Sequence, residues 1–289
     1  MLNILITGAS GNVGMEVIKA LIKNQYPLNL VAGVRDIKTD EQKLLGYKIN
    51  FVRFDFTDPS TYPKAFQNCD VLFLLRPPHL SDVKKYFFPL VASAKKLAIK
   101  HIVFLSVQGV EKSKIIPHYK IEKLIVESAI PYTFLRPAYF MQNFTTTLHE
   151  DLVNKKKIFL PAGNAKFTVV DVRDIGNAAA IIISETNKHI NACYELTCHE
   201  KLTFNEMANK LSDGLGVKIT YESPNLLAFY LAKRKEKMPT MLIVVMMMLH
   251  YLPRFQKEPK ITNWVKTITG DEPITFEQFV TDNSMLLIK

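Results

Sequence analysis

The sequence predicts an α/β fold, a doubly wound parallel sheet with a small, mostly helical C-terminal cap. Three observations predict it. Short apolar runs of strand length alternate with segments of helical periodicity through about the first 200 residues. The first of these runs passes through a glycine-rich turn into a helix. After residue 198 the composition shifts towards methionine and aromatic residues. We therefore expect residues 1–138 with 168–198 to form the sheet domain, and residues 139–167 with 199–289 to form the cap.

The opening turn carries the most specific motif. Residues 2–6 form an apolar run, a glycine-rich turn follows, and apolar residues then recur at helical spacing. Gly8 allows the tight turn, Gly11 lets the backbone approach a pyrophosphate, and Gly14 lets the helix pack close to the strand. The unpaired N–H groups of the helix start would face the phosphates. The motif therefore predicts a dinucleotide-binding Rossmann domain. The expected cofactor contacts in this turn are Gly8, Ser10, Gly11, Asn12, Val13 and Gly14.

The end of the second strand bears on the choice of dinucleotide. The apolar run 28–34 ends at Arg35 and Asp36, and in a doubly wound fold this position lies beside the adenosine ribose. An arginine there accommodates the 2′-phosphate of NADP, whereas an acid binds the 2′-hydroxyl of NAD. Because a guanidinium can form two hydrogen bonds to a phosphate, Arg35 leads us to favour NADP(H). Asp36 leaves NAD as an alternative cofactor. A solvent-exposed salt pair at a strand end is the structural alternative.

The third and fourth strands end in further candidate cofactor contacts. Asp55 and Phe56 follow the third apolar run. The Asp55 carboxylate is placed either to accept from the adenine amino group or to cap the loop before the next helix. The fourth run ends at Leu75 and is closed by Arg76 and Pro77. We expect these three residues to pass under the cofactor and to contact it through their backbone.

The fifth and sixth strands lead to the expected substrate side. A strand at 101–105 ends at Ser106, whose hydroxyl is placed to bond the nicotinamide ribose or a substrate oxygen, or else to cap a loop. After a helix at 117–127, a strand at 131–137 stops at a proline. The aromatic residues that follow should reach the nicotinamide and suit a flat acceptor. The expected contacts are Pro137 and Tyr139 for the cofactor, and Tyr139, Phe140, Met141 and Asn143 for the substrate.

Later elements return the chain to the sheet. The pattern predicts a strand at 167–174, a helix at 175–183 and a late strand at 193–197. Residues 270–275 introduce a final helix within the cap.

Composition and charge narrow the function classes. The net charge of +10 comes from scattered lysines without a nucleic-acid-binding signature, so we expect no nucleic-acid partner. The longest apolar run, 241–249, is shorter than the roughly 20 residues that span a bilayer, and we expect no membrane partner. Three cysteines form no motif and indicate a reducing compartment. With no signal peptide expected before the first strand, these features predict a cytoplasmic monomer or homodimer that acts on a small molecule and holds no metal.

Three parts of the sequence resemble a known family. The Thr7–Gly14 motif, the Val34-Arg35 pair and the segment Ile130–Phe144 are similar to the NmrA-like atypical short-chain dehydrogenases/reductases. Within that group the likeness is greatest to NADPH-dependent quinone oxidoreductases and triphenylmethane reductases, a type often labelled nucleotide-sugar epimerase. The likeness is firmest through residue 200 and faint in the cap. It implies a nicotinamide dinucleotide cofactor and hydride transfer.

A literal catalytic motif lies out of register with that family. Tyr119 and Lys123 have the Tyr-x-x-x-Lys spacing of short-chain dehydrogenases that act on alcohols. Counting back from the strand at 131–137 places the family's lysine at His118 and its tyrosine at Lys114. Five residues along a helix rotate a side chain by about 140°, so we expect the literal pair to point elsewhere. A histidine at the position of His118 is a further point of resemblance to the quinone and triphenylmethane reductases.

The absence of a catalytic tyrosine at the family's position narrows the reactions that the protein is expected to catalyse. Oxidising an unactivated alcohol or epimerising a sugar becomes hard, whereas reducing a quinone or a carbocationic dye needs mainly hydride delivery. The sequence therefore predicts an NADPH-dependent reductase of a small electrophilic, aromatic or quinone-like compound. His118, either catalytic or structural, would donate a hydrogen bond or proton to the developing oxyanion, with Ser106 as a second candidate. A non-catalytic NADP(H)-sensing regulator is the competing interpretation, and a nucleotide-sugar epimerase or dehydratase is the third.

Overall fold

The computed structural model describes residues 1–44, 46–47 and 49–288. Over these residues the chain divides into two compact units. Unit 1 contains Met1–Pro137, Val172–Leu196 and Trp264–Asp271, and unit 2 contains Ala138–Asp171, Thr197–Asn263 and the segment from Glu272 onwards. The division predicted from the sequence differs from these units mainly in two places. Residues 168–171 belong to unit 2, and a short stretch after Asn263 returns to unit 1.

Unit 1 is built on a seven-stranded sheet in which every pair of neighbouring strands is parallel. The strand order is β10-β6-β5-β4-β1-β2-β3, so the chain runs to one edge through β2 and β3 and then crosses to β4 on the other side of β1. Ligands of such sheets bind at the carboxyl ends of the strands, where this order reverses. The strands are β1 (Leu2–Thr7), β2 (Leu28–Val34), β3 (Asn50–Arg53), β4 (Val71–Leu75), β5 (His101–Leu105), β6 (Tyr132–Pro137) and β10 (Ala192–Leu196).

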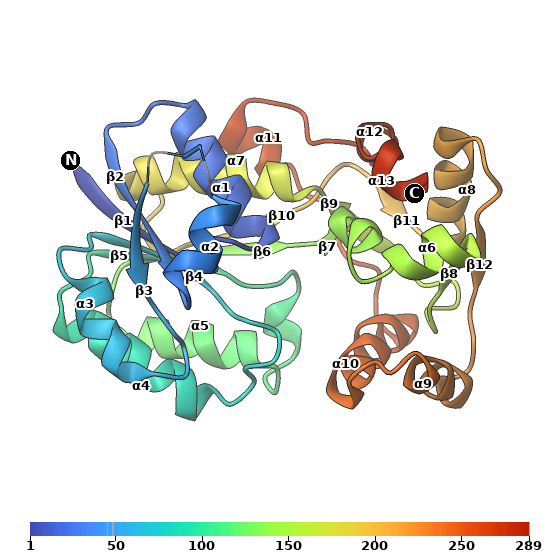
Figure 1. Ribbon diagram of the computed structural model, residues 1–289, viewed down its shortest axis with the longest axis horizontal. Helices are drawn as coiled ribbons and strands as arrows, with labels where there is room; N and C mark the ends of the chain where they lie inside the picture. Colours follow the sequence, from blue (N-terminus) through green and yellow to red (C-terminus); the bar gives the residue numbers. More distant parts are fainter. Residues whose placement is uncertain (45, 48, 289) are drawn as a thin grey trace. The chain divides into compact units, whose positions relative to one another are not determined.

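Helices cover both faces of this sheet, which confirms the predicted doubly wound fold (Figure 1). α1, α7 and α11 lie on one face, and α3, α4 and α5 lie on the other. Gly176 allows α7 to approach α1, because a Cβ there would lie 2.7 Å from the carbonyl carbon of Glu16. The helices of unit 1 are α1 (Asn12–Lys23), α2 (Ile37–Lys43), α3 (Tyr62–Phe66), α4 (Val83–Lys96), α5 (Pro117–Ser128), α7 (Val172–Ser184) and α11 (Trp264–Thr269), with 3₁₀ turns at Pro59–Thr61, Val110–Lys112 and Thr186–Lys188.

Unit 2 combines short strands with helices around an aromatic core. Its sheets are β11-β9-β7 and β12-β8, and α8 begins at a capping box formed by Thr203 and Glu206. The strands are β7 (Tyr139–Phe140), β8 (Lys157–Phe159), β9 (Phe167–Val170), β11 (Lys201–Leu202) and β12 (Thr220–Glu222). The helices are α6 (His149–Lys155), α8 (Phe204–Leu215), α9 (Leu226–Lys235), α10 (Thr240–Tyr251), α12 (Phe276–Asp282) and α13 (Ser284–Ile288), with 3₁₀ turns at Met141–Thr145 and Leu252–Phe255.

The strand predicted at 167–174 needs a correction. β9 ends at Val170 and pairs within unit 2, while Val172 already begins α7 in unit 1. The acid in the first turn, Asp174, suits a helix start because it faces the positive end of the helix dipole. Within the described ranges, every helix is too short or too polar to cross a lipid bilayer.

Candidate functional site

The turn after β1 has the geometry that a dinucleotide fingerprint requires. Gly8 adopts a left-handed φ of 63°, and the amide of Gly11 donates to the Gly8 carbonyl at 3.0 Å. A Cβ on Gly14 would lie 2.3 Å from the Gly8 carbonyl oxygen and 2.8 Å from its carbonyl carbon, so no larger residue fits without backbone movement. Gly11 occupies the N-cap of α1 and supplies no side-chain acceptor there. The first amides of α1, including those of Asn12 and Val13, are thus available to an anion.

The end of β2 separates the two residues that bear on cofactor choice. Asp36 is the N-cap of α2, and its carboxylate accepts from the Lys38 amide and the Thr39 hydroxyl, both at 3.0 Å. The hydrogen bonds from Thr39 are the main reason that the pKa of Asp36 is lowered. Arg35 is exposed and forms no ion pair within the described ranges, so the alternative of an Arg35–Asp36 salt pair is wrong.

Asp55 and Phe56 both make contacts with other residues of unit 1. One oxygen of the Asp55 carboxylate accepts from the amide and the hydroxyl of Thr57, each at 2.8 Å, which is the loop-capping role that the sequence left open. The Phe56 side chain is buried and meets the ring of Phe54 edge-on at 4.9 Å. The contact of either residue with adenine stays a prediction.

Arg76 uses its side chain as well as its backbone. Its Nη1 donates to three carbonyls of its own loop, those of Pro77 at 3.1 Å, Pro78 at 3.0 Å and Leu80 at 3.0 Å. Its Nε donates to Nε2 of His118 on α5 at 3.3 Å. The expectation of backbone contact alone missed this role. The guanidinium therefore fixes the loop after β4 and ties it to the histidine on α5.

These contacts define the proton state of His118. A guanidinium only donates, so Nε2 must accept and the ring proton must lie on Nδ1. Burial, with the Arg76 charge beside it, lowers the pKa of His118 to about 3. The imidazole is neutral at physiological pH, and donation of a proton from an imidazolium is therefore disfavoured. A hydrogen bond from Nδ1–H is the remaining role that the geometry allows.

Ser106 is an unsatisfied polar group at the carboxyl end of β5. Its backbone amide donates to the Leu135 carbonyl at 2.7 Å. Its hydroxyl is buried, with 5 % of the residue exposed, and it has no hydrogen-bond partner among the residues that the structure describes. Buried hydroxyls are normally paired, so this one has capacity for a ligand or a water molecule. The alternative of a loop-capping bond finds no support in the geometry.

The literal Tyr-x-x-x-Lys pair does not face His118. The buried residues of α5 are Ile121, Glu122 and Ile125, which fall on the helix face that His118 shares by spacing. Lys123 has a side chain 65 % exposed and pairs with Glu127 at 3.6 Å. Lys123 therefore lies on the solvent side of the helix, as the register argument predicts, while Tyr119 is half-buried.

The residues expected to contact substrate lie in unit 2, around Tyr139. The Tyr139 hydroxyl lies 3.2 Å from Nε2 of His250, whose Nδ1 lies 2.6 Å from the Met246 carbonyl. Since a carbonyl only accepts, Nδ1 donates and Nε2 accepts from the phenol. Burial raises the pKa of Tyr139, and a hydrogen bond involving the Asn143 side chain partly offsets this. Met141 is fully buried in the core of this unit, which corrects its expected substrate contact to a packing role.

The other residues named from the sequence have simpler surroundings. Phe140 and Asn143 are half-buried, Pro137 is buried at the end of β6, and Leu75 packs against Gly8. Ser10 is half-buried in the opening turn. The roles assigned to them in binding stay predictions.

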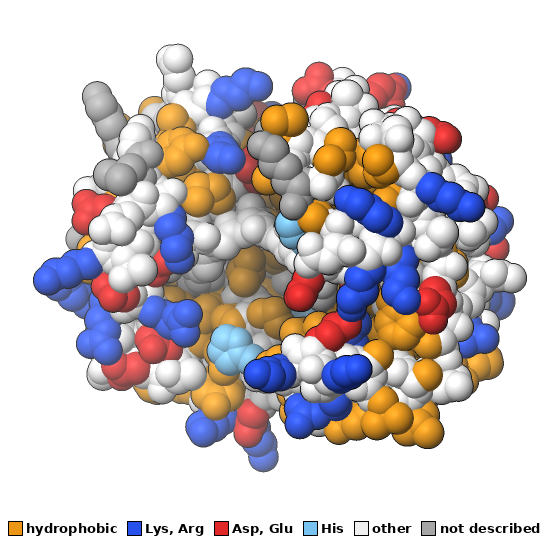
Figure 2. Space-filling view, turned by 45° about the vertical axis from the view of Figure 1, so that its right-hand side comes forward, with side chains coloured by type: hydrophobic (Ala, Val, Ile, Leu, Met, Phe, Trp, Pro, Cys, Tyr) orange, Lys and Arg blue, Asp and Glu red, His pale blue; other side chains and the backbone are white. Residues whose placement is uncertain are grey.

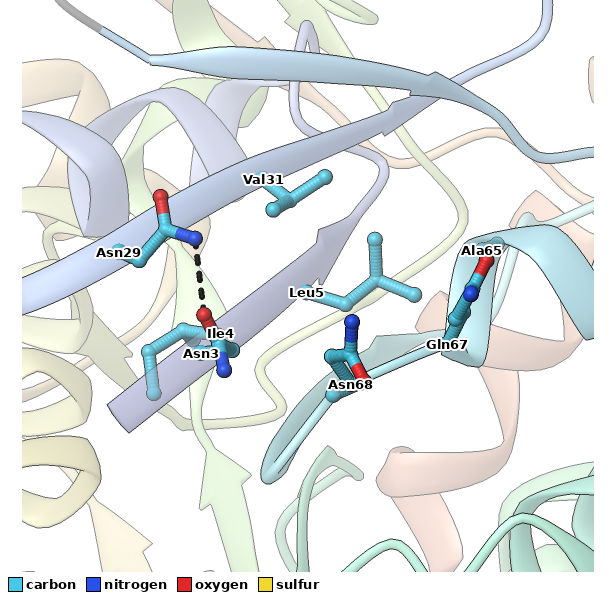
Figure 3. Close-up of a pocket in the computed structure, with 9 residues that line it drawn as sticks. Asn3, Ile4, Leu5, Asn29, Val31, Ala65, Gln67 and Asn68 are labelled. Carbon is cyan, nitrogen blue, oxygen red and sulfur yellow. Dashed lines mark hydrogen bonds between the residues drawn. The ribbon is translucent and has the colours of Figure 1, made fainter. Parts of the chain in front are cut away.

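A shallow pocket lies at the opposite, amino edge of the sheet in unit 1 (Figure 3). Asn3 of β1 and Asn29 of β2 line it, and the Asn29 amide donates to the Asn3 side-chain oxygen at 2.8 Å. The Asn50 amide extends this ladder to Asn29 at 2.9 Å. Because open α/β sheets bind ligands at the carboxyl ends of their strands, we assign this pocket no part in the candidate site.

Comparison with known proteins agrees with this geometry. The NmrA-like family matches the sequence over residues 2–247. Prestalk A differentiation protein A of Dictyostelium discoideum is 30% identical, over 96% of this chain and 91% of its own length. An NAD(P)H azoreductase of Xenophilus azovorans is 26% identical over 96% of each chain. The structure of an NADPH-dependent quinone oxidoreductase from Escherichia coli, complexed with NADPH, has a TM-score of 0.86 at 24% identity, over 96% of this chain and 99% of that chain.

Proposed function

The chain belongs to the NmrA-like family, and from this membership and the site in unit 1 we propose that it is an NADPH-dependent reductase. Its acceptor would be a small electrophile, aromatic or quinone-like, that takes hydride directly. The approach of Gly14 to the Gly8 carbonyl is the observation that carries the proposal, because it lets α1 begin directly against the turn that follows β1. The same glycine lets α1 pack close to β1, and in dinucleotide-binding folds this close packing brings the helix start to the pyrophosphate.

The residues of unit 1 fit NADP(H) better than NAD. Arg35 is exposed at the end of β2, where the 2′-phosphate would lie, and its guanidinium is available to fork onto it. Asp36, which would serve the 2′-hydroxyl of NAD, already accepts three hydrogen bonds as the cap of α2. The nicotinamide of the bound cofactor would supply the hydride. The Ser106 hydroxyl, which is buried and has no partner among the described residues, would bond its ribose or the acceptor oxygen.

The proton chemistry of the site favours an activated acceptor. His118 is neutral, so it offers a hydrogen bond from Nδ1–H and not a proton from an imidazolium. Lys123, the lysine of the literal pair, is exposed and pairs with Glu127, away from the buried face of α5. A quinone or azo acceptor becomes negatively charged once hydride arrives and needs that charge stabilised, whereas a carbocationic acceptor becomes neutral. None of the three needs a base to remove a hydroxyl proton. The fixed positive charge of Arg76 beside His118 supports such stabilisation.

The direct test measures turnover. Purified protein is mixed with NADPH and a panel of quinones, azo dyes and triphenylmethane dyes, and loss of NADPH absorbance is followed. We expect oxidation of NADPH by at least one acceptor class, with NADH used less well. Calorimetric titration of both cofactors against the wild type and Arg35→Ala completes the test. Equal affinity of the wild type for NADPH and NADH would contradict the phosphate assignment, and absence of binding to either would overturn the reductase.

A regulatory function is the second candidate. It is supported by the relative that is 30% identical, whose name is that of a differentiation protein and not of an enzyme. Tight NADPH binding without turnover on any acceptor of the panel would favour this sensor over the reductase. An epimerase or dehydratase has no support in the geometry of α5, and full activity of Tyr119→Phe would remove it.

A further inference from the structure

Unit 2 exposes an apolar helix surface that its own fold does not cover. α10 consists almost entirely of aliphatic residues and methionines, yet it buries only Ile243, Met246 and His250. A helix that is hydrophobic all round is normally buried on every side. Here the side chains at the other positions of the helix meet solvent, with Met241 65 % exposed and Leu249 54 % exposed.

Helical spacing shows that this exposed surface is continuous. Met241, Val244, Met248 and Leu252 follow one another at intervals of three or four residues, so they lie in one stripe opposite the buried residues. All four are exposed, and Phe255, in the turn that follows α10, is 72 % exposed. A contiguous exposed surface of this kind marks an interaction site.

The neighbouring helix continues the surface and adds charge. α9 packs against α10, and Leu227 and Leu231 are exposed on it. Arg234 and Lys235 follow them at helical spacing and close its last turn. Figure 2 shows hydrophobic side chains along the lower edge of the view, in the region of α9 and α10, with Lys and Arg side chains beside them.

The segment 226–260 is strongly basic. It holds seven lysines and arginines against two glutamates, which is half of the net charge of +10 carried by the whole chain. The two glutamates are already paired: Glu236 with Lys155 at 2.5 Å and Lys233 at 2.8 Å, and Glu258 with Lys201 at 3.1 Å. The exposed cations that form no ion pair within the described ranges are Arg234, Lys235, Lys237, Arg254 and Lys257.

We propose that this surface, formed by α9, α10 and the turn that follows them, binds the face of a membrane rich in anionic lipids. Apolar side chains would enter the interface between headgroups and acyl chains, while the flanking cations meet the lipid phosphates and carboxylates. The 12 residues of α10 are about 18 Å long, against a hydrocarbon core of about 30 Å. The helix therefore lies on the bilayer and does not span it.

The charge argues against a second copy of this chain as the occupant. A two-fold interface would place the same basic segment of both copies side by side, and like charges brought together in an interface oppose association. The expectation of no membrane partner rested on the length of the apolar run, and that length excludes only a spanning helix. This inference does not rest on the proposed reductase activity.

Co-sedimentation of the full-length protein with vesicles tests the proposal. We expect binding to vesicles of phosphatidylcholine mixed with phosphatidylserine and little binding to phosphatidylcholine alone. Because the Debye length shrinks from about 10 Å at 0.1 M salt to about 3 Å at 1 M, binding should weaken over that range. Equal binding to both vesicle types, or no binding to either, would overturn the proposal.

Two matched pairs of variants locate the surface. Arg234→Glu with Lys235→Glu should weaken vesicle affinity at least about 30-fold, while Lys95→Glu with Lys96→Glu, which close the last turn of α4 in the same way, should not. Met241→Ser with Leu249→Ser should weaken it about tenfold. Their control is Met285→Ser with Leu286→Ser, at residues of similar exposure in α13.

Circular dichroism and NADPH titration of each variant separate misfolding and loss of the cofactor site from loss of docking. Equal losses in test and control variants would contradict the assignment of this surface. Self-association of the wild type that Met241→Ser with Leu249→Ser abolishes, without any vesicle binding, would show that a second copy covers it. If the protein bound vesicles but did not bind NADPH, the membrane proposal would be supported and the proposed reductase function would be contradicted.

Discussion

Unit 1 and unit 2 each hold a hydrogen-bonded histidine, and the two differ in whether a ring nitrogen is left without a partner. His118 accepts from Arg76 through Nε2, and its Nδ1–H has no partner within the described ranges. His250 engages both ring nitrogens, one with the Tyr139 hydroxyl and one with the Met246 carbonyl. Burial lowers both pKa values, to about 3 for His118 and about 4 for His250.

The comparison directs the search for a ligand site to polar groups that lack a hydrogen-bond partner, whatever their residue type. Unit 1 has such capacity in the Ser106 hydroxyl after β5, in the first amides of α1 after β1, and in the Nδ1–H of His118 on α5. In unit 2 the ring centroids of Phe167 and Phe204 lie 5.7 Å and 5.6 Å from that of Tyr139, so aromatic side chains pack against this residue. The first arrangement suits a ligand, and the second suits a core.

The largest effect should come from filling the turn in unit 1. Gly14→Ala places a methyl group where the Gly8 carbonyl already lies, so the turn must shift away from the phosphates. We expect NADPH affinity to fall at least about 100-fold, measured by calorimetric titration. Gly216→Ala in unit 2 is the control, because its left-handed φ of 65° costs stability without touching the turn. An unchanged dissociation constant in Gly14→Ala would show that the turn does not hold the cofactor.

His250→Ala should destabilise the protein more than His118→Ala does. The first change opens a cavity in an aromatic core and removes the acceptor of the Tyr139 hydroxyl, at a cost of about 2 kcal/mol. The second leaves the Arg76 guanidinium with its three carbonyl acceptors, and about 1 kcal/mol is expected. Urea unfolding measures both. Equal losses would contradict the view that only His250 is a core residue.

The sequence predicts the sheet of unit 1 well and the interior of unit 2 poorly. In unit 1 the central strands are apolar runs bounded by turn residues, so β2 and β5 lie where the pattern predicts them. The strands of unit 2, such as β7 and β11, span only two residues and pair through tertiary contacts that no local pattern records. The side-chain bonds of Arg76 and the capping role of Asp36 also depend on loop geometry, which residue identity alone does not determine.

A smaller effect should separate the two nitrogens of His118. If Nδ1–H bonds the developing negative charge of the acceptor, His118→Phe should lower kcat about tenfold while the KM for NADPH stays unchanged. His118→Asn, whose amide nitrogen falls near the position of Nδ1, should keep most of the rate. His118→Gln, whose amide falls near Nε2, should not. Equal rates in the Asn and Gln variants would assign His118 to positioning Arg76 instead.

The smallest effect should appear as a loss of stability in mild acid. Histidines in the unfolded chain titrate near 6.5, while burial lowers the pKa values of His118 to about 3 and of His250 to about 4. As the pH falls below 6.5, the unfolded state binds protons that the folded state refuses, so stability is present above that pH and lost below it. Each histidine should cost roughly 1 kcal/mol at pH 5.5.

Urea unfolding of the wild type at pH 7.5 and 5.5 measures this loss, and the variants His118→Asn and His250→Asn apportion it. Each variant should lose roughly 1 kcal/mol less between the two pH values than the wild type does. His101, whose pKa burial lowers to about 4, contributes equally to all three proteins and cancels in the comparison. Most carboxylates stay ionised above pH 5, so the difference reports the histidines. If only His250→Asn reduced the loss, His118 would be protonated more readily than its contact with Arg76 implies. The assignment of His118 as a neutral hydrogen-bond donor would then be wrong.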